Sequence, residues 1–134
     1  MATVLKTGGV WITVCGALAL LMGVPGKAYC HFDTLPPNAS LPTDAQCAQW
    51  VMASPTSENR PDNEQANQSV PAKSQLQAFW SQPTTPAFAP PGDFTRVDGN
   101  FKGTTDEIIR WAACKWGIDE DVARAEAVAE TNWH

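Results

Sequence analysis

The sequence predicts a mainly α protein in three parts: an N-terminal signal helix, a long proline-rich segment, and a C-terminal helix-turn-helix pair. Three observations predict this arrangement. An apolar run stands near the N-terminus, ten prolines fall in the middle, and two capped helical patterns follow near the C-terminus. We therefore divide the chain into residues 1–28, 29–100 and 101–134. Its 134 residues suffice for one small domain with flanking segments.

Residues 1–28 have the pattern of a secretory signal peptide. Lys6 supplies a positive charge, and Val10–Val24 is an apolar run of 15 residues. Gly26 and Ala28 then place small residues at positions −3 and −1 of a cleavage site. The run is shorter than the roughly 18 to 20 residues that a membrane-spanning helix needs. We expect export to the cell envelope, the periplasm or the medium; an uncleaved membrane anchor is the alternative, and would be the chain's one membrane contact.

The charge of the mature chain excludes one class of partner. The leader holds two lysines and no acid, so 9 − 2 = 7 basic residues remain against 14 acidic ones, a net charge of −7. No basic cluster offsets this balance, which argues against binding to nucleic acid. His31 and His134 are far apart and the cysteine spacing fits no zinc pattern, so we expect neither a metal nor a cofactor.

The cysteines of the mature chain are candidates for disulfides. Removal of the leader takes Cys15 and leaves Cys30, Cys47 and Cys114. In an exported protein such residues are disulfide partners more often than metal ligands. Three is an odd number, so we expect one thiol that is free, intermolecular or lacking its partner in this chain.

Residues 29–100, rich in Pro, Ser, Thr and Asn, are expected to be mostly disordered. Repeated prolines interrupt any helix or central strand, and the polar composition buries little apolar surface. Within this segment, residues 44–53 form a candidate short helix that carries Cys47 and Trp50. Residues 75–80 are a shorter candidate.

A first C-terminal helix is predicted to begin after Thr104 and to end at Gly117. Thr104 and Glu107 have the spacing of a capping box, in which each side chain binds the backbone N–H of the other residue. Glycine after the last turn provides a left-handed cap. Four residues share an arc of about 100° and form the predicted core face: Ile108, Ile109, Ala112 and Trp116. Together with Trp111, the last of these is expected in the core rather than as a sugar-stacking platform.

The opposite face of this helix is predicted to carry ion pairs and a cysteine. Arg110 stands four residues after Asp106 and three after Glu107, which favours pairing on the helix surface. Cys114 lies on the outer side, where it can bond a segment packed around the helix. The Cys47 segment is a candidate for that partner, giving a Cys47–Cys114 disulfide.

A second helix follows after a very short turn. Asp119 is a good N-cap, and residues 122–130 are strongly helix-forming, with four alanines among nine. The residues that share its apolar stripe are Val122, Ala125, Ala129 and Trp133. The short turn predicts a tight corner or hairpin between the two helices.

The turn and the end of the second helix resemble the opening of the soluble lytic transglycosylase domain of the lysozyme-like superfamily. That family runs a helix into a Tyr-Gly-Ile-Asp-Pro turn, and an alanine- and leucine-rich helix then ends in Glu-Ser with an aromatic residue two positions later. Here the turn is Lys115–Asp119 and the ending is Ala129–Trp133. The family's catalytic Glu follows the turn glycine by thirteen positions, the spacing between Gly117 and Glu130. The similarity covers residues 104–134.

The sequence departs from the family pattern at three positions. Glu120 stands where proline is usual, Thr131 replaces serine, and Glu126 replaces an apolar or small residue. Glu126 either adds like-charge repulsion to Glu130, four residues later, or is a solvated surface residue.

The resemblance implies that Glu130 is the general acid and base that cleaves the MurNAc–GlcNAc bond of peptidoglycan strands. It also implies that Thr131 and Trp133 contact the substrate. A carboxylic acid in an apolar pocket keeps its proton near neutral pH, as this chemistry requires. Ala123 and Ala127 are expected to leave room for a sugar beside Glu130.

Two helices and a proline-rich segment do not make a water-excluding pocket, so we expect Glu130 to be exposed here. The expectation is an N-terminal part of a peptidoglycan-cleaving enzyme, truncated and inactive by itself. Two alternatives remain open. One is a non-catalytic secreted or envelope protein whose helical pair docks onto a partner; the other is a membrane-anchored protein that keeps its leader.

Overall fold

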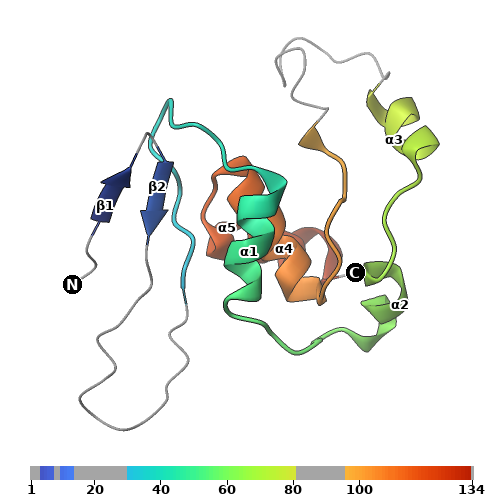
Figure 1. Cartoon of the computed structure of the whole chain (residues 1–134). Helices are drawn as coiled ribbons and strands as arrows, with labels where there is room; N and C mark the ends of the chain where they lie inside the picture. The colour runs from blue at the N-terminus through green and yellow to red at the C-terminus, as the bar shows by residue number, and fades with distance from the viewer. Residues whose placement is uncertain (1–3, 8–9, 14–29, 81–95, 134) are drawn as a thin grey trace, which may run out of the picture.

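The computed structural model describes residues 4–7, 10–13, 30–80 and 96–133. Its elements are β1 (Val4–Thr7), β2 (Val10–Thr13), α1 (Asp44–Met52), the 3-10 helix η1 (Pro61–Asn63), α2 (Glu64–Asn67), α3 (Lys73–Trp80), α4 (Thr105–Trp116) and α5 (Glu120–Thr131). This part of the chain is mainly helical, as predicted. In Figure 1, α1, α4 and α5 lie together, and α2 and α3 lie to one side of them.

The first part of residues 1–28 forms two strands, where a signal helix was expected. β1 and β2 pair antiparallel, with Val4 opposite Thr13 and Thr7 opposite Val10. Valine, isoleucine and threonine dominate these segments, and β-branched residues favour strands. Most of the predicted apolar run and the cleavage site lie outside the described residues. Among the residues described, no helix is long and apolar enough to cross a bilayer.

Helix α1 confirms the short helix predicted for residues 44–53, and it ends at Met52. The side chain of Thr43 accepts a hydrogen bond from the N–H of Gln46, whose own side chain accepts one from the N–H of Thr43. This capping box satisfies N–H groups that the first turn leaves without helical partners. The helix turns Cys47 and Val51 into the core, where both are fully buried.

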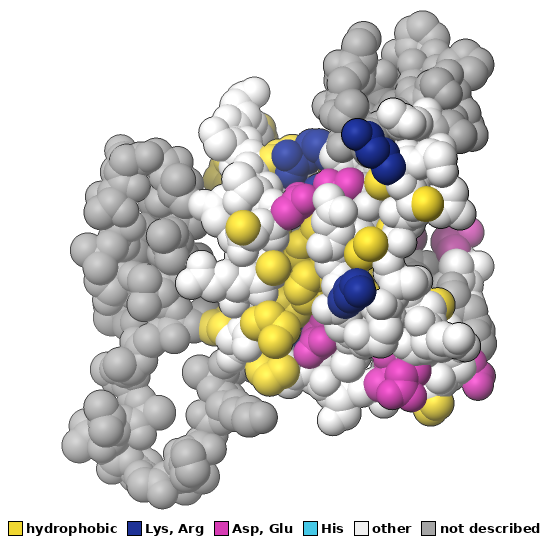
Figure 2. Space-filling view, turned by 45° about the vertical axis from the view of Figure 1, so that its right-hand side comes forward, with side chains coloured by type: hydrophobic (Ala, Val, Ile, Leu, Met, Phe, Trp, Pro, Cys, Tyr) yellow, Lys and Arg dark blue, Asp and Glu magenta, His cyan; other side chains and the backbone are white. Residues whose placement is uncertain are grey.

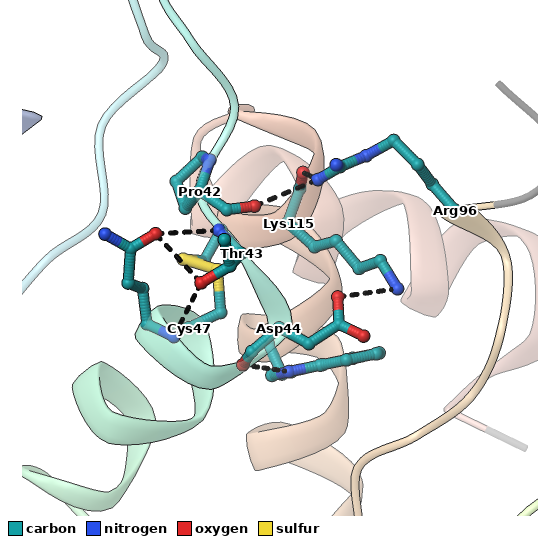
Figure 3. Close-up of a disulfide and its surroundings, with 9 residues drawn as sticks. Pro42, Thr43, Asp44, Cys47, Arg96 and Lys115 are labelled. Atoms are coloured by element: carbon teal, nitrogen blue, oxygen red, sulfur yellow. Dashed lines mark hydrogen bonds and ion pairs between the residues drawn. A yellow bond between two sulfur atoms is a disulfide. The ribbon is translucent and has the colours of Figure 1, made fainter.

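The core is small and is closed by a disulfide between α1 and α4. Cys47 and Cys114 are bonded, as predicted, across 67 positions of sequence (Figure 3). Cys114 lies on the side of α4 away from the predicted apolar stripe, as expected, and α1 buries it there. Trp111 belongs to the same core, as expected, and stacks on Phe101 with the ring centres 5.6 Å apart. Cys30 is disulfide-bonded too, so the expectation that one of Cys30, Cys47 and Cys114 lacks a partner in this chain is wrong.

The segment between α1 and α2 is held against the start of α4. The backbone N–H of Thr56 donates to Glu107, and the N–H of Thr105 donates to Glu58, both at 2.9 Å. Asn67 donates from its side-chain amide to Glu58 at 3.0 Å and to the Thr105 hydroxyl at 2.9 Å. We expected residues 29–100 to be mostly disordered. Between α1 and the end of α2, polar side chains satisfy N–H and hydroxyl groups at the start of α4, whereas residues 81–95 lie outside the described residues.

Helix α4 buries the face that was predicted to be polar and exposed. Arg110 and Lys115 have side chains only 0% and 2% exposed, and Asp106 and Glu107 are buried as well. The four apolar residues predicted as the core face are only partly buried: Ile108, Ile109, Ala112 and Trp116. The reason is that α1, fixed by the disulfide, covers the charged side of α4. Partners from other segments then neutralise the charges, such as Asp44 and Asp98, which lie 2.9 and 2.6 Å from the Lys115 ammonium.

Helices α4 and α5 form the predicted hairpin. The capping box of Thr104 and Glu107 is present, and Gly117 ends α4 with φ 67°, as predicted. Asp119 caps α5 by accepting hydrogen bonds from the N–H groups of the two residues that follow Glu120. Glycine takes the left-handed conformation of residue 117 without steric cost. This turn reverses the chain, so that α5 returns along α4.

Candidate functional site

An open groove of about 440 Å³ lies between α4 and α5, and Glu130 lines it. The residues around it are Ile109, Ala112, Ala113, Trp116, Ile118, Ala123, Glu126, Ala127 and Glu130. Ala123 and Ala127 keep the α5 wall free of bulk, as expected from the sequence. The groove is therefore an apolar channel with carboxylates along α5.

Glu130 itself is exposed, as expected, and lies on the last turn of α5. Glu126 is one helical turn earlier and is also exposed. Residues four apart lie on the same side of a helix. The two carboxylates therefore follow one another along the same wall of the groove.

The groove exists because the apolar side of α4 is not covered by α1. Helix α5 presents mostly alanine to it, and alanine fills little space. Figure 2 shows hydrophobic side chains gathered in a band on the face turned to the viewer, with both acidic and basic side chains beside it. Apolar side chains thus reach the surface together instead of being buried.

The two residues predicted to contact substrate with Glu130 are placed differently from it. The Thr131 hydroxyl donates to the carbonyl of Ala127 at 2.8 Å, which holds it against its own helix. Trp133 follows the helix with φ 67°, and its carbonyl accepts a hydrogen bond from Asn63 at 2.6 Å. Neither residue is among those that line the groove. The aromatic residue that does line it is Trp116, which the sequence analysis had assigned to the core.

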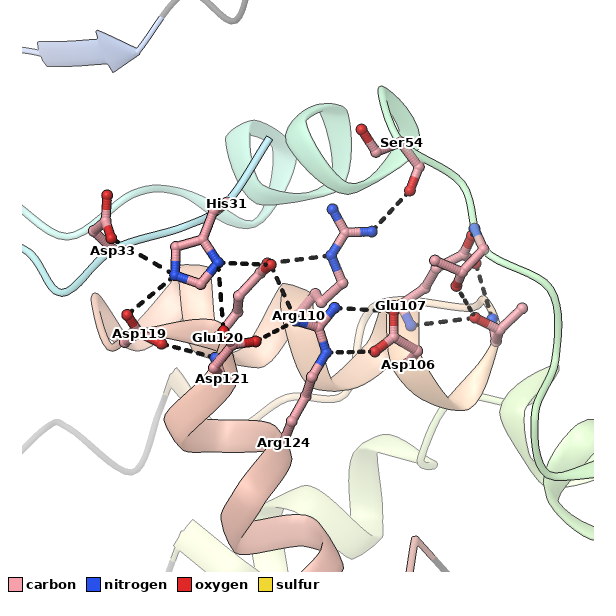
Figure 4. Close-up of polar contacts among 12 residues, drawn as sticks. His31, Asp33, Ser54, Asp106, Glu107, Arg110, Asp119, Glu120, Asp121 and Arg124 are labelled. Carbon is pink, nitrogen blue, oxygen red and sulfur yellow. Dashed lines mark hydrogen bonds and ion pairs between the residues drawn. The ribbon is translucent and has the colours of Figure 1, made fainter. Parts of the chain in front are cut away.

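A second group of functional side chains surrounds His31, just before the segment that leads to α1. Its Nε2 lies 3.1 Å from a carboxylate oxygen of Asp119 and 3.6 Å from one of Asp33. Its Nδ1 lies 3.2 Å from Glu120 and 3.9 Å from Asp121. Figure 4 shows the imidazole among these acids at the start of α5.

This arrangement favours the protonated imidazole. The hydrogen bond to Asp119, together with the charges of Glu120 and Asp121, raises the pKa of His31 above its usual value. The same hydrogen bond, from the imidazole, lowers the pKa of Asp119. Both directions describe one pair, in which an imidazolium faces a carboxylate.

The donor atoms around His31 also have the spacing of a metal site. One ligand atom each from His31, Asp119 and Asp121 lies within 4.8 Å of the others. No metal was expected from the sequence, because His31 stands 88 or more positions before the two aspartates and no local pattern links it to them. Carboxylates face both ring nitrogens of His31 and favour its protonated form. A metal cation that binds the imidazole would therefore have to displace a proton from it.

The acids around His31 continue into a buried ionic network that holds the hairpin. Glu120 and Arg110 are both fully buried, and their charged groups approach to 3.2 Å. Arg110 also donates to the carbonyl of Ser54 at 2.8 Å, and Arg124 bridges Glu120 and Asp106 at 3.1 and 2.7 Å. Arg110 was expected to pair with Asp106 and Glu107 on its own helix, and the structure gives it a partner from α5, Glu120 (Figure 4).

Comparisons with protein-family models, with curated proteins and with solved structures gave no match for this chain.

Proposed function

We propose that this chain belongs to an exported, lysozyme-like protein that cleaves peptidoglycan, with Glu130 as general acid and base. The observation that carries the proposal is the position of Glu130 on a groove with small residues and Trp116 around it. Glu130 stands thirteen residues after the turn glycine, Gly117, and this is the spacing of the lytic transglycosylase pattern.

In the proposed reaction, the Glu130 carboxyl group donates a proton to the glycosidic oxygen between MurNAc and GlcNAc. The leaving sugar departs, and the carboxylate then takes a proton from the attacking oxygen. If that oxygen is the 6-hydroxyl of MurNAc, the product carries a 1,6-anhydro ring; if it is water, the product is a reducing sugar. General acid catalysis contributes about 10²- to 10⁴-fold to such a rate.

The open groove sets a condition for activity. A carboxyl group exposed to water does not hold a proton at neutral pH, whereas burial in an apolar site raises its pKa. We therefore propose that Glu130 acts when further protein covers the groove, and that the 134 residues by themselves are inactive. Ile109, which is only partly buried, is a residue that such a cover would contact.

The decisive experiment is to sequence the source gene through codon 134 and to assay its complete product on purified murein. We expect release of soluble muropeptides and a loss of at least about 100-fold in rate for Glu130→Gln. Glu64→Gln, a change of an exposed acid in α2, is the matched control and should keep the rate. Full activity of the Glu130→Gln variant would refute the catalytic assignment, and mass spectrometry of the products would distinguish anhydro from reducing ends.

Export through residues 1–28 is part of the proposal. The bonded Cys47 and Cys114 support it, since disulfides persist in oxidising compartments outside the cytosol. The mass of the mature protein tests it. A chain that starts after Ala28 supports cleavage, whereas a product that keeps residues 1–28 supports a membrane anchor.

A non-catalytic docking module is the second candidate function. It is favoured by the exposed apolar side chains of α5, since Val122 and Val128 are 58% and 46% exposed. Exposed apolar side chains on a helix can contact a helical partner. Binding to murein that Trp116→Ala weakens would favour the glycan function, whereas absence of glycan binding by the complete product would favour docking.

A further inference from the structure

The charged side chains that line the groove are all acidic. Among its lining residues the only ionisable side chains are Glu126 and Glu130, and no lysine or arginine is included. Their spacing places both carboxylates on one wall of the groove. A ligand in this groove therefore meets negative charge over an apolar floor.

Three cations of α4, α5 and the segment before α4 have partners outside the groove. Arg124 pairs with Asp106, Glu120 and Asp121, and Lys115 pairs with two acids beneath Trp111. The guanidinium of Arg96 lies 5.7 Å from the centre of the Trp116 ring. Arg96 donates to the carbonyls of Pro42 and Lys115 and does not line the groove. Within the described part of the chain, neither Glu126 nor Glu130 pairs with a cation, so a cationic ligand can neutralise their charge.

We infer that the groove prefers glycan strands whose glucosamine residues carry free amino groups, and that Glu126 determines this preference. The inference rests on the proposed glycan function and names its substrate class. An amino sugar bears an ammonium group on a ring with an apolar face. The ring face suits Trp116 and the alanines, and the ammonium suits the carboxylates.

Acetylated strands fit the same groove less well. An N-acetyl group is neutral and leaves both carboxylates without a counter-charge. Stem peptides of peptidoglycan carry carboxylates of their own, which Glu126 and Glu130 repel at short range. Glu126 stands where the family pattern has a small or apolar residue, so its charge is a feature of this chain.

The expected preference is modest because both carboxylates are exposed. An ion pair at a protein surface changes an affinity by about fivefold at most, so two of them should give about threefold to tenfold. The effect should fall as salt is added, since exposed charges are screened.

The test is a titration of the full chain with two probes, a glucosamine pentamer and an N-acetylglucosamine pentamer, followed by tryptophan fluorescence and calorimetry at low salt. We expect the glucosamine pentamer to bind about three to ten times more tightly. Glu126→Gln should reduce that ratio to about two or less, whereas Glu64→Gln should leave it unchanged. Trp116→Ala should weaken both pentamers alike.

Three results would overturn the inference: equal affinity for the two pentamers, an unchanged ratio in Glu126→Gln, or binding of an oligolysine peptide as tight as that of the amino sugar. The last would show a surface for basic peptides. If only the preference for amino sugars is wrong, both pentamers still bind. If the proposed function is wrong, neither pentamer binds and the complete product does not cleave murein. Thermal melting of each variant checks that it is folded.

Discussion

The carboxylate of Glu120 lies 3.2 Å from Nε of Arg110, and both side chains are fully buried. The pair joins the first turn of α5 to the middle of α4, so it fixes how the hairpin closes. Figure 4 shows that the pair is continuous with His31 on one side and with Arg124 on the other. The geometry of the groove between the helices depends on this buried pair.

Removal of one partner of the pair should destabilise the fold strongly. In Glu120→Ala, the buried guanidinium of Arg110 loses its counter-charge, and such losses cost about 3–5 kcal/mol. Urea unfolding followed by circular dichroism measures the change. Glu64→Gln, at an exposed position of α2, is the control and should change the free energy of unfolding by less than about 0.5 kcal/mol. A loss below about 1 kcal/mol in Glu120→Ala would contradict the role given to the pair.

The Cys47–Cys114 bond should be a main source of stability. It closes a loop of 67 positions, and a cross-link over such a loop stabilises by about 3–4 kcal/mol through the entropy of the unfolded chain. The variant Cys47→Ala/Cys114→Ala should therefore unfold at much lower denaturant, with the disulfide of Cys30 kept. If its midpoint equals that of the parent chain, α1 is held to α4 by packing alone.

The His31 cluster should make stability depend on pH at both ends. The pKa of His31 is raised in the fold, so its contribution is complete below its ordinary value of 6.5 and is lost as pH rises through the folded pKa. The pKa of Asp119 is lowered, so its contribution is present above 3.8 and is lost as pH falls through the folded pKa. Stability from this pair is therefore greatest between those limits.

Unfolding by urea from about pH 5 to about pH 9 measures the upper limit. We expect His31→Gln to remove most of the decline in stability above pH 6.5 that the parent chain shows. His134 is present in both proteins, so its titration cancels in the comparison. Parallel pH profiles for the two proteins would rule out the pairing of His31 with Asp119 in solution.

Gly117 should tolerate asparagine better than alanine. Its φ of 67° costs an alanine about 1–2 kcal/mol, and a Cβ there would lie 3.0 Å from side-chain atoms of Leu35 and Leu41. Asparagine meets the same two neighbours but enters the left-handed region more readily. Thermal melting should rank the proteins as parent, Gly117→Asn, Gly117→Ala, and the reverse order of the two variants would show that the turn is not left-handed.

Elements with local signals were predicted well. These elements depend on residues within four positions of one another. They are the caps at Thr104 and Asp119, the end of α4 at Gly117 and the helix that carries Cys47. Such interactions form within one helical turn and do not depend on the rest of the fold. The position of Glu130 beside small residues followed from the same helical periodicity.

The contents of the core could not be predicted in this way. A helical wheel for α4 shows an apolar side and a charged side, and the usual rule buries the apolar one. Here Arg110 and Lys115 are buried instead, because Glu120, Asp44 and Asp98 come from other segments to pair with them. No local sequence pattern predicts such partners, because they are distant in the sequence. The cost of burying a charge is offset only when folding brings its partner close.

The sequence by itself determined where the C-terminal helices begin and end, how they turn, and which acid stands thirteen residues after the turn glycine. Tertiary structure decided which side of α4 faces the core, and with it that the apolar side would line an open groove. It also brought His31 to Asp119 across 88 positions. The physical reason is that capping is a short-range interaction within one turn, whereas burial and ion pairing depend on which distant segments the disulfide and the hairpin bring together.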